Sequence, residues 1–420
     1  MTVEDLENWN PWWNTNKVPE ILKGIEREID PLIFKTLNEK EIIILTGIRR
    51  SGKTTIMYQM IEQLLKEHET SQIIYLNLDD EKLKIKTLEE IYDLYRQEKN
   101  PNKKAFIFLD EIQNKKEWEK FLKKYYDMRA NVKFIISGSS ASLLKQEYST
   151  LLTGRNFTFK ITPLTFKEYL KFSDIAINKI DSKNKNQIIH KLNQFLEIGG
   201  FPEAFFKEEE LKKILLKEYF DDIIYKDIIS RHNINAKKIN DLATYLLTNI
   251  TSPFTIRKLR NYTGLSIDSI KEYISYLEDS FMLKIITHFS YSLKEKDRLP
   301  KKPYCVDNGI RNVASFRFSK DFGRLAENLV WIELNRREKD IYYWKEKGEV
   351  DFVIKNKDNS LVAINVSYTN EINERETNAL IEFKKKFNKT NELILITKDT
   401  EKTNDSIKYI PLWKWLLEEI

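Results

Sequence analysis

The chain has 420 residues, of which 41% are hydrophobic and 32% charged, and its formal net charge is +6. This composition predicts about two to four globular domains with sizeable cores, and it excludes a disordered chain. Because no apolar run approaches the ~18 residues of a spanning helix and the start is acidic and polar, we expect a cytoplasmic protein with no membrane segment. The single cysteine, Cys305, excludes an internal disulfide and a cysteine-based zinc cluster.

The first 38 residues contain two adjacent tryptophans, Trp12 and Trp13, and then an amphipathic run over residues 21–37. Two interpretations stay open. The tryptophans dock on the domain that follows, or the residues upstream of the next motif contact a bound base.

The most specific motif is the run TGIRRSGKT at residues 46–54, which stands between an apolar run at 42–45 and a helical run at 56–65. A pattern G-x-x-x-x-G-K-[ST] in that setting is typical of the loop that grips phosphates with helix N-terminal N–H groups. We expect the lysine to reach the β- and γ-phosphates and the threonine to bind Mg²⁺. The predicted nucleotide-binding residues are Gly47, Ile48, Arg49, Arg50, Ser51, Gly52, Lys53, Thr54, Thr55 and, further on, Ser137.

Strand-like and helix-like patterns alternate as far as residue 161, which predicts a parallel α/β sheet covered on both faces. The expected strands are residues 42–45, 73–78, 105–109, 132–136 and 157–161. The third strand ends in Asp110 and Glu111. We predict that Asp110 holds the metal and that Glu111 polarises the attacking water.

Two later positions extend this site. Ser137 opens a run of small polar residues that could sense the γ-phosphate, although Ser139 or Ser140 would serve equally as a helix cap. Arg155 precedes the fifth strand and is a candidate for stabilising transition-state charge, in its own subunit or in a neighbour's. A surface arginine is the alternative, and the oligomeric state stays open.

Residues 163–231 have a helical pattern and form a candidate lid, and residues 232–308 have the pattern of a winged helix-turn-helix. Its helices are expected near 242–247, 255–259 and 267–280, with a turn at Gly264. Residues 232–303 hold twelve Lys or Arg against seven Asp or Glu. This excess predicts weak, non-specific binding of double-stranded DNA, while use of the module for protein packing is the alternative. The basic wing comprises Lys294, Lys296, Arg298, Lys301 and Lys302.

The last segment, residues 309–420, has the pattern of a second α/β unit. Helices are expected at 327–337 and 378–387, and strands at 341–344, 350–354, 361–366 and 393–396.

As a series, these motifs resemble a large prokaryotic group of P-loop ATPases, best represented in archaea. The resemblance rests on GIRRSGKTT, FIFLDEIQ, SGSS, TGR, PLTFKEYL, GGFPEAF, YCVDNGI, and GRLAENLVWIEL followed by GEVDFVI. The group joins an AAA-like ATPase to a winged helix and a carboxy-terminal domain of the PD-(D/E)xK nuclease type. It implies binding and hydrolysis of ATP with Mg²⁺.

The carboxy-terminal domain departs from that nuclease pattern. The resemblance places a helix carboxylate at Glu327 and metal-binding acids at Glu349 and Asp351. An active site would next need an acid and a lysine on the following strand, where this chain has Asn365 and Ser367. We therefore expect a restriction-endonuclease-like fold without cleavage.

These interpretations combine into an α/β protein of four parts. Residues 1–162 form the P-loop ATPase core, 163–231 the lid, 232–308 the winged helix-turn-helix and 309–420 the nuclease-like domain. The predicted function couples nucleotide state to DNA binding or assembly. The alternatives are a STAND-like signalling or assembly switch that does not involve DNA, and an ATP-gated, metal-dependent endonuclease.

Overall fold

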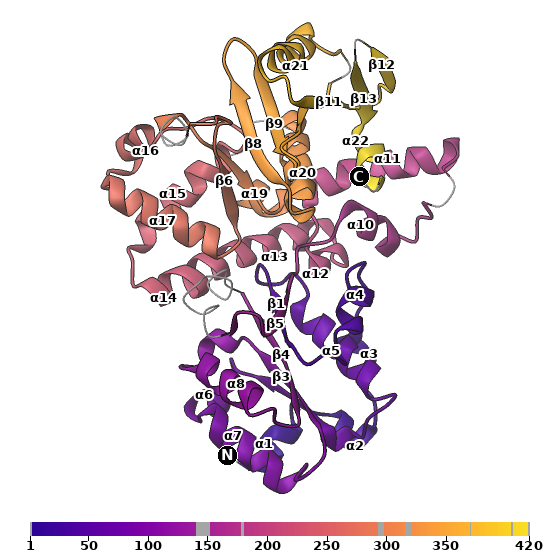
Figure 1. Ribbon diagram of the computed structural model, residues 1–420, viewed down its shortest axis with the longest axis vertical. Coiled ribbons are helices and arrows are strands. Elements are labelled where there is room, and N and C mark those ends of the chain that lie inside the picture. The colour runs from indigo at the N-terminus through magenta and orange to yellow at the C-terminus, as the bar shows by residue number, and fades with distance from the viewer. Residues whose placement is uncertain are drawn as a thin grey trace. The chain divides into compact units, whose positions relative to one another are not determined.

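A computed structural model describes residues 2–139, 152–177, 180–292, 298–315, 321–369, 371–404 and 406–418. The chain divides into two compact units, Met1–Ile161 and Thr162–Ile420 (Figure 1). The division lies one residue before the predicted end of the ATPase core, and the three parts predicted downstream all fall within the second unit. Among the described residues, no helix has both the length and the apolar character needed to cross a membrane.

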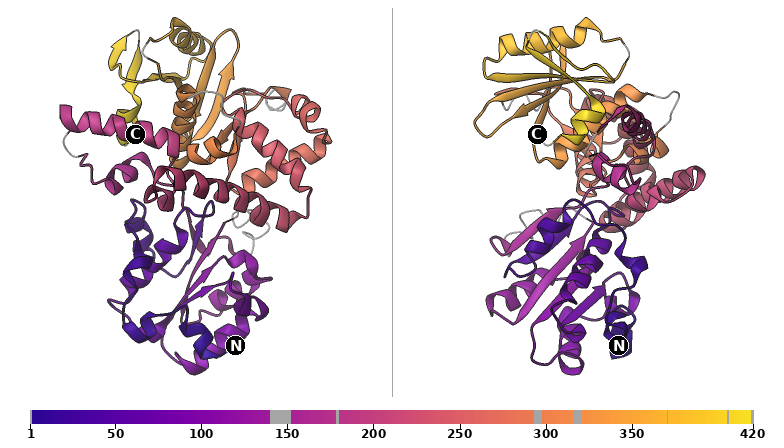
Figure 2. Two further views of the ribbon diagram at one scale, coloured as in Figure 1. Left: turned by 180° about the vertical axis from the view of Figure 1, so that it is seen from behind. Right: turned by 90° about the vertical axis from the view of Figure 1, so that its right-hand side faces the viewer.

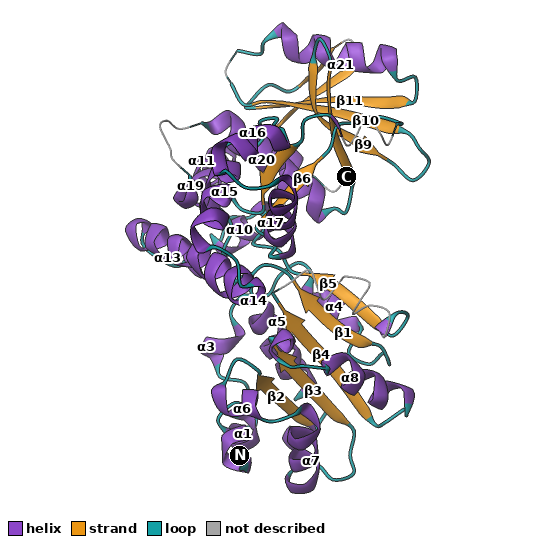
Figure 3. Cartoon of the chain, turned by 90° about the vertical axis from the view of Figure 1, so that its left-hand side faces the viewer, coloured by secondary structure: helices purple, strands orange, loops and turns teal. Residues whose placement is uncertain are grey.

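The first unit is built on a five-stranded parallel sheet with the strand order β2-β3-β4-β1-β5 (Figure 3). All five predicted strands are present, with ends shifted by at most two residues. They are β1 (Ile42–Thr46), β2 (Ile73–Asn77), β3 (Ala105–Asp110), β4 (Val132–Gly138) and β5 (Asn156–Lys160).

Helices cover both faces of this sheet, which explains why its central strands are almost continuously apolar. On β1, Ile43 and Leu45 pack on the face that carries α5 (Lys53–Leu64), whereas Ile42 and Ile44 pack on the opposite face. The unit also contains two 3-10 segments, Thr70–Gln72 and Ile112–Asn114. The other helices are α1 (Val3–Glu7), α2 (Trp12–Thr15), α3 (Glu20–Lys23), α4 (Asp30–Lys35), α6 (Glu81–Ile85), α7 (Leu88–Glu98) and α8 (Trp118–Asp127).

The amino-terminal tryptophans dock on the open edge of this sheet. The indole Nε1 atoms of Trp12 and Trp13 donate to the carbonyl oxygen of Ile73 on β2 at 3.1 and 2.8 Å. These bonds satisfy a backbone group that an edge strand leaves unpaired. Of the two interpretations of the tryptophans, the structure confirms docking.

The second unit begins with the helices α10 to α14. The helices α15, α16 and α17 follow, and after them comes the two-stranded antiparallel sheet of β6 and β7. Ser266 caps the third of these three helices, and Gly264 makes the predicted turn with φ +65°. The bounds are α10 (Phe166–Phe172), α11 (Ser182–Ile198), α12 (Pro202–Phe205), α13 (Glu209–Asp222), a π-helical turn (Ile223–Ile229), α14 (Ser230–His232), α15 (Ala236–Thr248), α16 (Ile256–Thr263), α17 (Ile267–Asp279), β6 (Leu283–Ile286) and β7 (Lys302–Cys305).

The chain then forms a six-stranded mixed sheet of order β12-β13-β11-β10-β9-β8 (Figure 2). Every helix and strand predicted here is present, and the sequence patterns missed α19, β12, β13 and α22. The bounds are α19 (Asn308–Ala314), α20 (Phe322–Arg336), β8 (Asp340–Lys345), β9 (Glu349–Lys355), β10 (Leu361–Ser367), α21 (Glu374–Lys386), β11 (Thr390–Thr397), β12 (Lys402–Asn404), β13 (Ile407–Pro411) and α22 (Leu412–Leu417).

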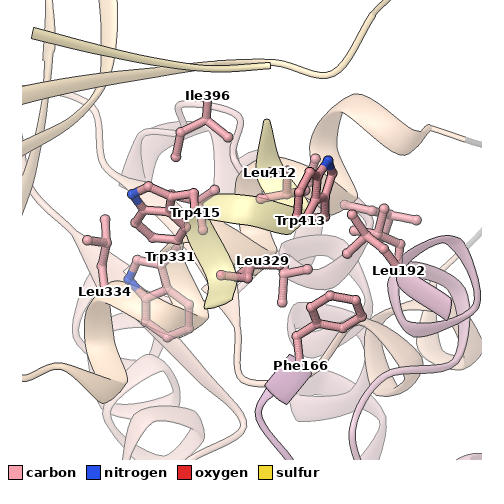
Figure 4. Packing of buried hydrophobic residues seen from close by; sticks show 14 of the residues in the cluster. Phe166, Leu192, Leu329, Trp331, Leu334, Ile396, Leu412, Trp413 and Trp415 are labelled. Atoms are coloured by element: carbon pink, nitrogen blue, oxygen red, sulfur yellow. The ribbon is translucent and has the colours of Figure 1, made fainter. Parts of the chain in front are cut away.

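One hydrophobic core joins the parts of the second unit. Phe166 of α10, Leu192 of α11 and Trp331 of α20 belong to the same buried cluster as Trp415 of α22 and Ile396 of β11 (Figure 4). Because a domain is defined by its own core, the predicted lid and the carboxy-terminal sheet form one packed body in this structure.

Asp307 adds a polar tie to this core. Its carboxylate accepts the backbone N–H of Gly200 at 2.6 Å and that of Ile310 at 3.1 Å. A Cβ at Gly199, whose φ is +80°, would lie 2.1 Å from Asp307 Oδ1, so only glycine fits there. The motifs GGFPEAF and YCVDNGI therefore meet at this carboxylate.

We predict that Asp307 gives the second unit a distinct pH dependence. Burial raises the pKa of Asp307 to about 6. The folded state then binds more protons than the unfolded chain between the ordinary pKa, near 4, and about 6, so this contribution to stability falls as pH rises through that window. In urea unfolding, the free-energy difference between wild type and Asp307→Asn should decrease from pH 4 to pH 7 by on the order of 3 kcal/mol. A difference that does not change with pH would contradict the assignment.

Candidate functional site

The predicted phosphate loop lies between β1 and α5, as its sequence pattern requires. Gly47 has φ +144°, and a Cβ there would lie 2.0 Å from the carbonyl oxygen of Ile161. Gly52 is the amino-terminal cap of α5 with φ +100°, and Arg50 is also left-handed with φ +67°. The two motif glycines are therefore required by close approach and by backbone conformation.

The polar groups of this loop fit a bound phosphate. Lys53 is 4% exposed, and its Nζ donates to the carbonyl oxygens of Gly47 and Ile48 at 2.9 and 3.0 Å. The hydroxyl of Ser51 is buried and has no hydrogen-bond partner among the described residues. A buried ammonium, an unsatisfied hydroxyl and the N-terminus of α5 together favour an anionic ligand.

Arg27 supports the loop from outside. Its guanidinium donates to the carbonyl oxygen of Ser51 at 3.2 Å, and its backbone N–H donates to Asp30 at 2.6 Å. Sequence analysis did not single out Arg27, because it belongs to no local motif and stands 24 residues before Ser51.

Asp110, at the carboxyl end of β3, accepts hydrogen bonds from three hydroxyl groups. Thr54 donates to Oδ2 at 2.6 Å, Tyr75 donates to the same oxygen at 2.7 Å, and Ser137 donates to Oδ1. The structure thus brings the two predicted metal ligands, Thr54 and Asp110, into direct contact. The hydroxyl of Ser137 is engaged with this carboxylate, and Ser140, the alternative cap, lies outside the described residues.

Glu111 follows in a left-handed conformation, with φ +56° and ψ +49°. Such a backbone costs on the order of 1 kcal/mol for a non-glycine residue and is found at functional sites. Its N–H donates to Ser137 Oγ at 3.3 Å, and its carboxylate accepts a hydrogen bond from Gln113. The half-buried Glu111 thus follows Asp110 directly, in a strained turn.

Arg155 lies at the other end of the sheet from the phosphate loop. It immediately precedes β5, and its carbonyl oxygen accepts the N–H of Ile42, the first residue of β1. Its guanidinium pairs with Asp127 at 3.0 Å. Because β1 separates it from the loop by roughly 15 Å at ~3.3 Å per residue, a role at its own P-loop is excluded. The pair with Asp127 agrees with the alternative of a surface arginine, and the transition-state role is left only in the form that acts in a neighbouring subunit.

A second cluster of charged groups surrounds Lys302 of β7. Its Nζ lies 2.7 Å from Glu349, 3.3 Å from Glu327 and 3.5 Å from Asp351. Tyr304 donates to Glu327 at 2.7 Å. The three acids of the predicted nuclease-like site are therefore brought together. The lysine among them comes from the segment predicted to form a DNA-binding wing, and with 1% of its side chain exposed it is unavailable to DNA.

The three acids stabilise the charge of Lys302, whereas burial opposes the charges of Glu327 and Asp351. Burial alone lowers the pKa of Lys302, but the negative charges of the three acids outweigh it and hold this pKa well above its ordinary value. Burial raises the pKa of Glu327 and of Asp351. Burial also acts to raise the pKa of Glu349, but Lys302 reverses this effect and the pKa is lowered. Lys302 is therefore a permanent ammonium ion in this site.

Asn365 of β10 has a structural role beside these acids. Its Oδ1 accepts the N–H of Asp351 at 2.9 Å, and its Nδ2 donates to the carbonyl oxygen of Glu349 at 3.1 Å. Among the described residues, no group of three or more His, Cys, Asp or Glu side chains is arranged to hold a metal ion.

The P-loop unit is similar in sequence to a known domain family. A family model described as an AAA domain matches residues 39–170, and two domains of unknown function match residues 189–321 and 322–415. The Walker-type ATPase PABY2304 of Pyrococcus abyssi aligns with a TM-score of 0.46 and 12% identity over 69% of this chain and 95% of that chain.

Two relatives match over most of their length. An uncharacterized protein of Haemophilus influenzae is 30% identical, with 90% of this chain and 94% of that protein covered. The uncharacterized protein MJ1544 of Methanocaldococcus jannaschii is 34% identical, with 94% of this chain and 91% of that protein covered. The chain has a P-loop NTPase fold with an AAA domain, and it belongs to the family of these two proteins.

Proposed function

We propose that this protein binds and hydrolyses ATP with Mg²⁺ and that its nucleotide state controls DNA binding or assembly. The observation that carries the ATPase proposal is the 2.6 Å hydrogen bond between Thr54 of the P-loop and Asp110 of β3. It joins the two specific motifs of the sequence into one site, beside a loop whose polar groups suit phosphate.

Each residue of the site has a distinct role in this proposal. Lys53 binds phosphate oxygens as a point charge, and Thr54 and Asp110 hold the metal ion. When bound, Mg²⁺ supplies stabilisation of the charge on the phosphates. Glu111 accepts a proton from water, a role that its position directly after Asp110 supports. Arg155 is assigned to the phosphates of a neighbouring subunit.

The charge distribution of the second unit favours α16 as the DNA-binding element of a winged helix. Helix α16 exposes Arg257, Lys258 and Arg260 and contains no acid. Helix α17, the recognition helix of the predicted module, has one lysine against four acids. Contacts with phosphates therefore favour α16, and the acidic α17 opposes base readout in the major groove.

The Lys302 cluster supports a carboxy-terminal domain that does not cut DNA. A metal-dependent nuclease needs carboxylates that are free to hold a cation. Here the Lys302 ammonium already stands among Glu327, Glu349 and Asp351. We propose that the cluster serves as a structural ion pair network between β7, α20 and β9.

The ATPase proposal predicts different outcomes for two substitutions. Lys53→Ala should abolish binding of a fluorescent ATP analogue, because the phosphates lose their point charge. Glu111→Gln should retain binding and lower phosphate release about 10²- to 10⁴-fold, because only proton transfer is lost. Normal hydrolysis by Glu111→Gln would disprove the role of Glu111.

The DNA proposal predicts that Arg257→Ala/Arg260→Ala lowers affinity for a duplex of arbitrary sequence. The slope of log affinity against log salt should fall by about 2, one unit for each lost phosphate contact. Lys384→Ala/Lys385→Ala is the control, because both lysines are exposed on α21 and the change removes the same charge elsewhere. Absence of duplex binding by wild type at low salt would favour the switch that does not involve DNA.

The proposed ion pair network predicts an asymmetry between two lysines that both contact Glu349. Lys302→Met should cost about 3–5 kcal/mol in urea unfolding, because it leaves buried carboxylates without a counter-charge. Lys345→Met, whose side chain is 52% exposed, should cost less than about 1 kcal/mol. Equal costs would contradict the network.

The absence of cleavage is tested separately with supercoiled plasmid and Mg²⁺ or Mn²⁺. The plasmid should stay intact under conditions where the protein retards it. Nicking that Asp351→Ala abolishes would show that the carboxylates are catalytic in spite of Lys302.

A further inference from the structure

Tyr75 is a partner of Asp110 that none of the sequence motifs includes. It stands on β2, is 1% exposed, and its ring packs 4.9 Å from that of Tyr58 on α5. Its hydroxyl donates to Asp110 Oδ2 at 2.7 Å, the same oxygen that accepts the hydroxyl of Thr54 at 2.6 Å. Tyr75 therefore acts directly on the oxygen that joins the two predicted metal ligands.

The backbone of Tyr75 is fixed by the amino-terminal segment. Strand β2 is an edge of the sheet, so the N–H and carbonyl of Tyr75 that point outward have no strand partner. The side chain of Asn10 forms the two hydrogen bonds that a neighbouring strand would form with Tyr75. Its Oδ1 accepts the N–H of Tyr75 at 2.7 Å, and its Nδ2 donates to the carbonyl oxygen at 3.0 Å.

Neighbouring contacts hold the same segment in register. Trp12 and Trp13 both donate to Ile73, two residues before Tyr75, and Asn10 Nδ2 also donates to the carbonyl oxygen of Leu6 at 2.7 Å. Tyr75 thus connects Asn10, which bonds its backbone, with Asp110, which accepts its hydroxyl. All three residues are buried, so an alternative arrangement would leave polar groups unsatisfied.

We propose that Tyr75 is a positioning residue for Asp110 and that the amino-terminal segment, through Asn10, sets its position. The inference rests on the proposed ATPase function and extends it to a segment outside the AAA match at residues 39–170. The hydroxyl of Tyr75 fixes which way the carboxylate presents its oxygens. Outer partners of this kind typically affect metal affinity about 10- to 100-fold.

The test is a titration with MgCl₂ in the presence of a fluorescent ATP analogue, monitored by the thermal unfolding midpoint and by fluorescence. Tyr75→Phe keeps the packed ring and removes the hydroxyl. The Mg²⁺ concentration for half-maximal stabilisation should rise about 10- to 100-fold. Binding of the analogue in EDTA should be unchanged, because Lys53 and the loop are intact.

Tyr95→Phe is the matched control. Tyr95 is also fully buried, and its hydroxyl donates to the carbonyl oxygen of Ser71 at 2.7 Å, without contact to Asp110. It should lower the unfolding midpoint and leave the half-saturating Mg²⁺ concentration unchanged. An equal shift of that concentration in both variants would show that Tyr75 acts only through general stability.

Asn10→Ala tests the second half of the inference. It should raise the half-saturating Mg²⁺ concentration in the same direction as Tyr75→Phe, and the double variant should add no further shift, because Asn10 acts through Tyr75. An Asn10→Ala protein that loses stability with unchanged Mg²⁺ dependence would overturn the role of the segment.

Different outcomes contradict the ATPase proposal and the inference about Tyr75. If the wild type shows no stabilisation that depends on both Mg²⁺ and the nucleotide analogue, the ATPase proposal fails. If the wild type shows it and Tyr75→Phe keeps the wild-type half-saturation, the inference about Tyr75 fails alone.

Discussion

The buried carboxylate of Asp110 is the constraint on which the first unit depends. An isolated buried carboxylate is costly, so its oxygens must be supplied with donors. Strands β2 and β4 flank β3 and supply Tyr75 and Ser137, while Thr54 comes from the helix that follows β1. The strand order therefore determines which side chains can contact Asp110. The phosphate loop and the predicted metal aspartate are joined by the hydrogen bond between Thr54 and Asp110, which links one motif to the other.

The two acidic centres of the chain satisfy their charge in opposite ways. Asp110 is surrounded by neutral hydroxyl groups, which stabilise the carboxylate and leave its negative charge uncompensated. Glu327, Glu349 and Asp351 instead surround the ammonium of Lys302. The first arrangement favours an added cation, whereas the second already contains one. This difference separates a site suited to metal-dependent chemistry from one suited to holding three structural elements together.

Apart from β12, whose three residues are exposed, and β13, the sequence predicted the strands of both sheets, because short apolar runs that alternate with helical patterns are typical of strands in a covered sheet. It also predicted the P-loop, whose residues are contiguous. Arg155 stands before β5, and in a parallel sheet this position lies at the end opposite the loop that follows β1, so the predicted sheet already separates it from the phosphates of its own chain. Lys302 was predicted to belong to a basic DNA-binding wing because it stands in a basic run, although its side chain on β7 is buried. Tyr75 was not predicted to contact the site, because it stands within an apolar strand pattern in which a tyrosine reads as a core residue.

The remaining motifs of the second unit are explained by packing. Gly199 and Asp307 stand far apart in the sequence, yet the glycine leaves the space that the carboxylate occupies. The same core takes residues from α10 and α22, which belong to the parts predicted as lid and nuclease-like domain. A lid that moved independently would have to expose this core and leave Asp307 without its backbone donors. The parts predicted as lid and nuclease-like domain therefore share one core and form one body.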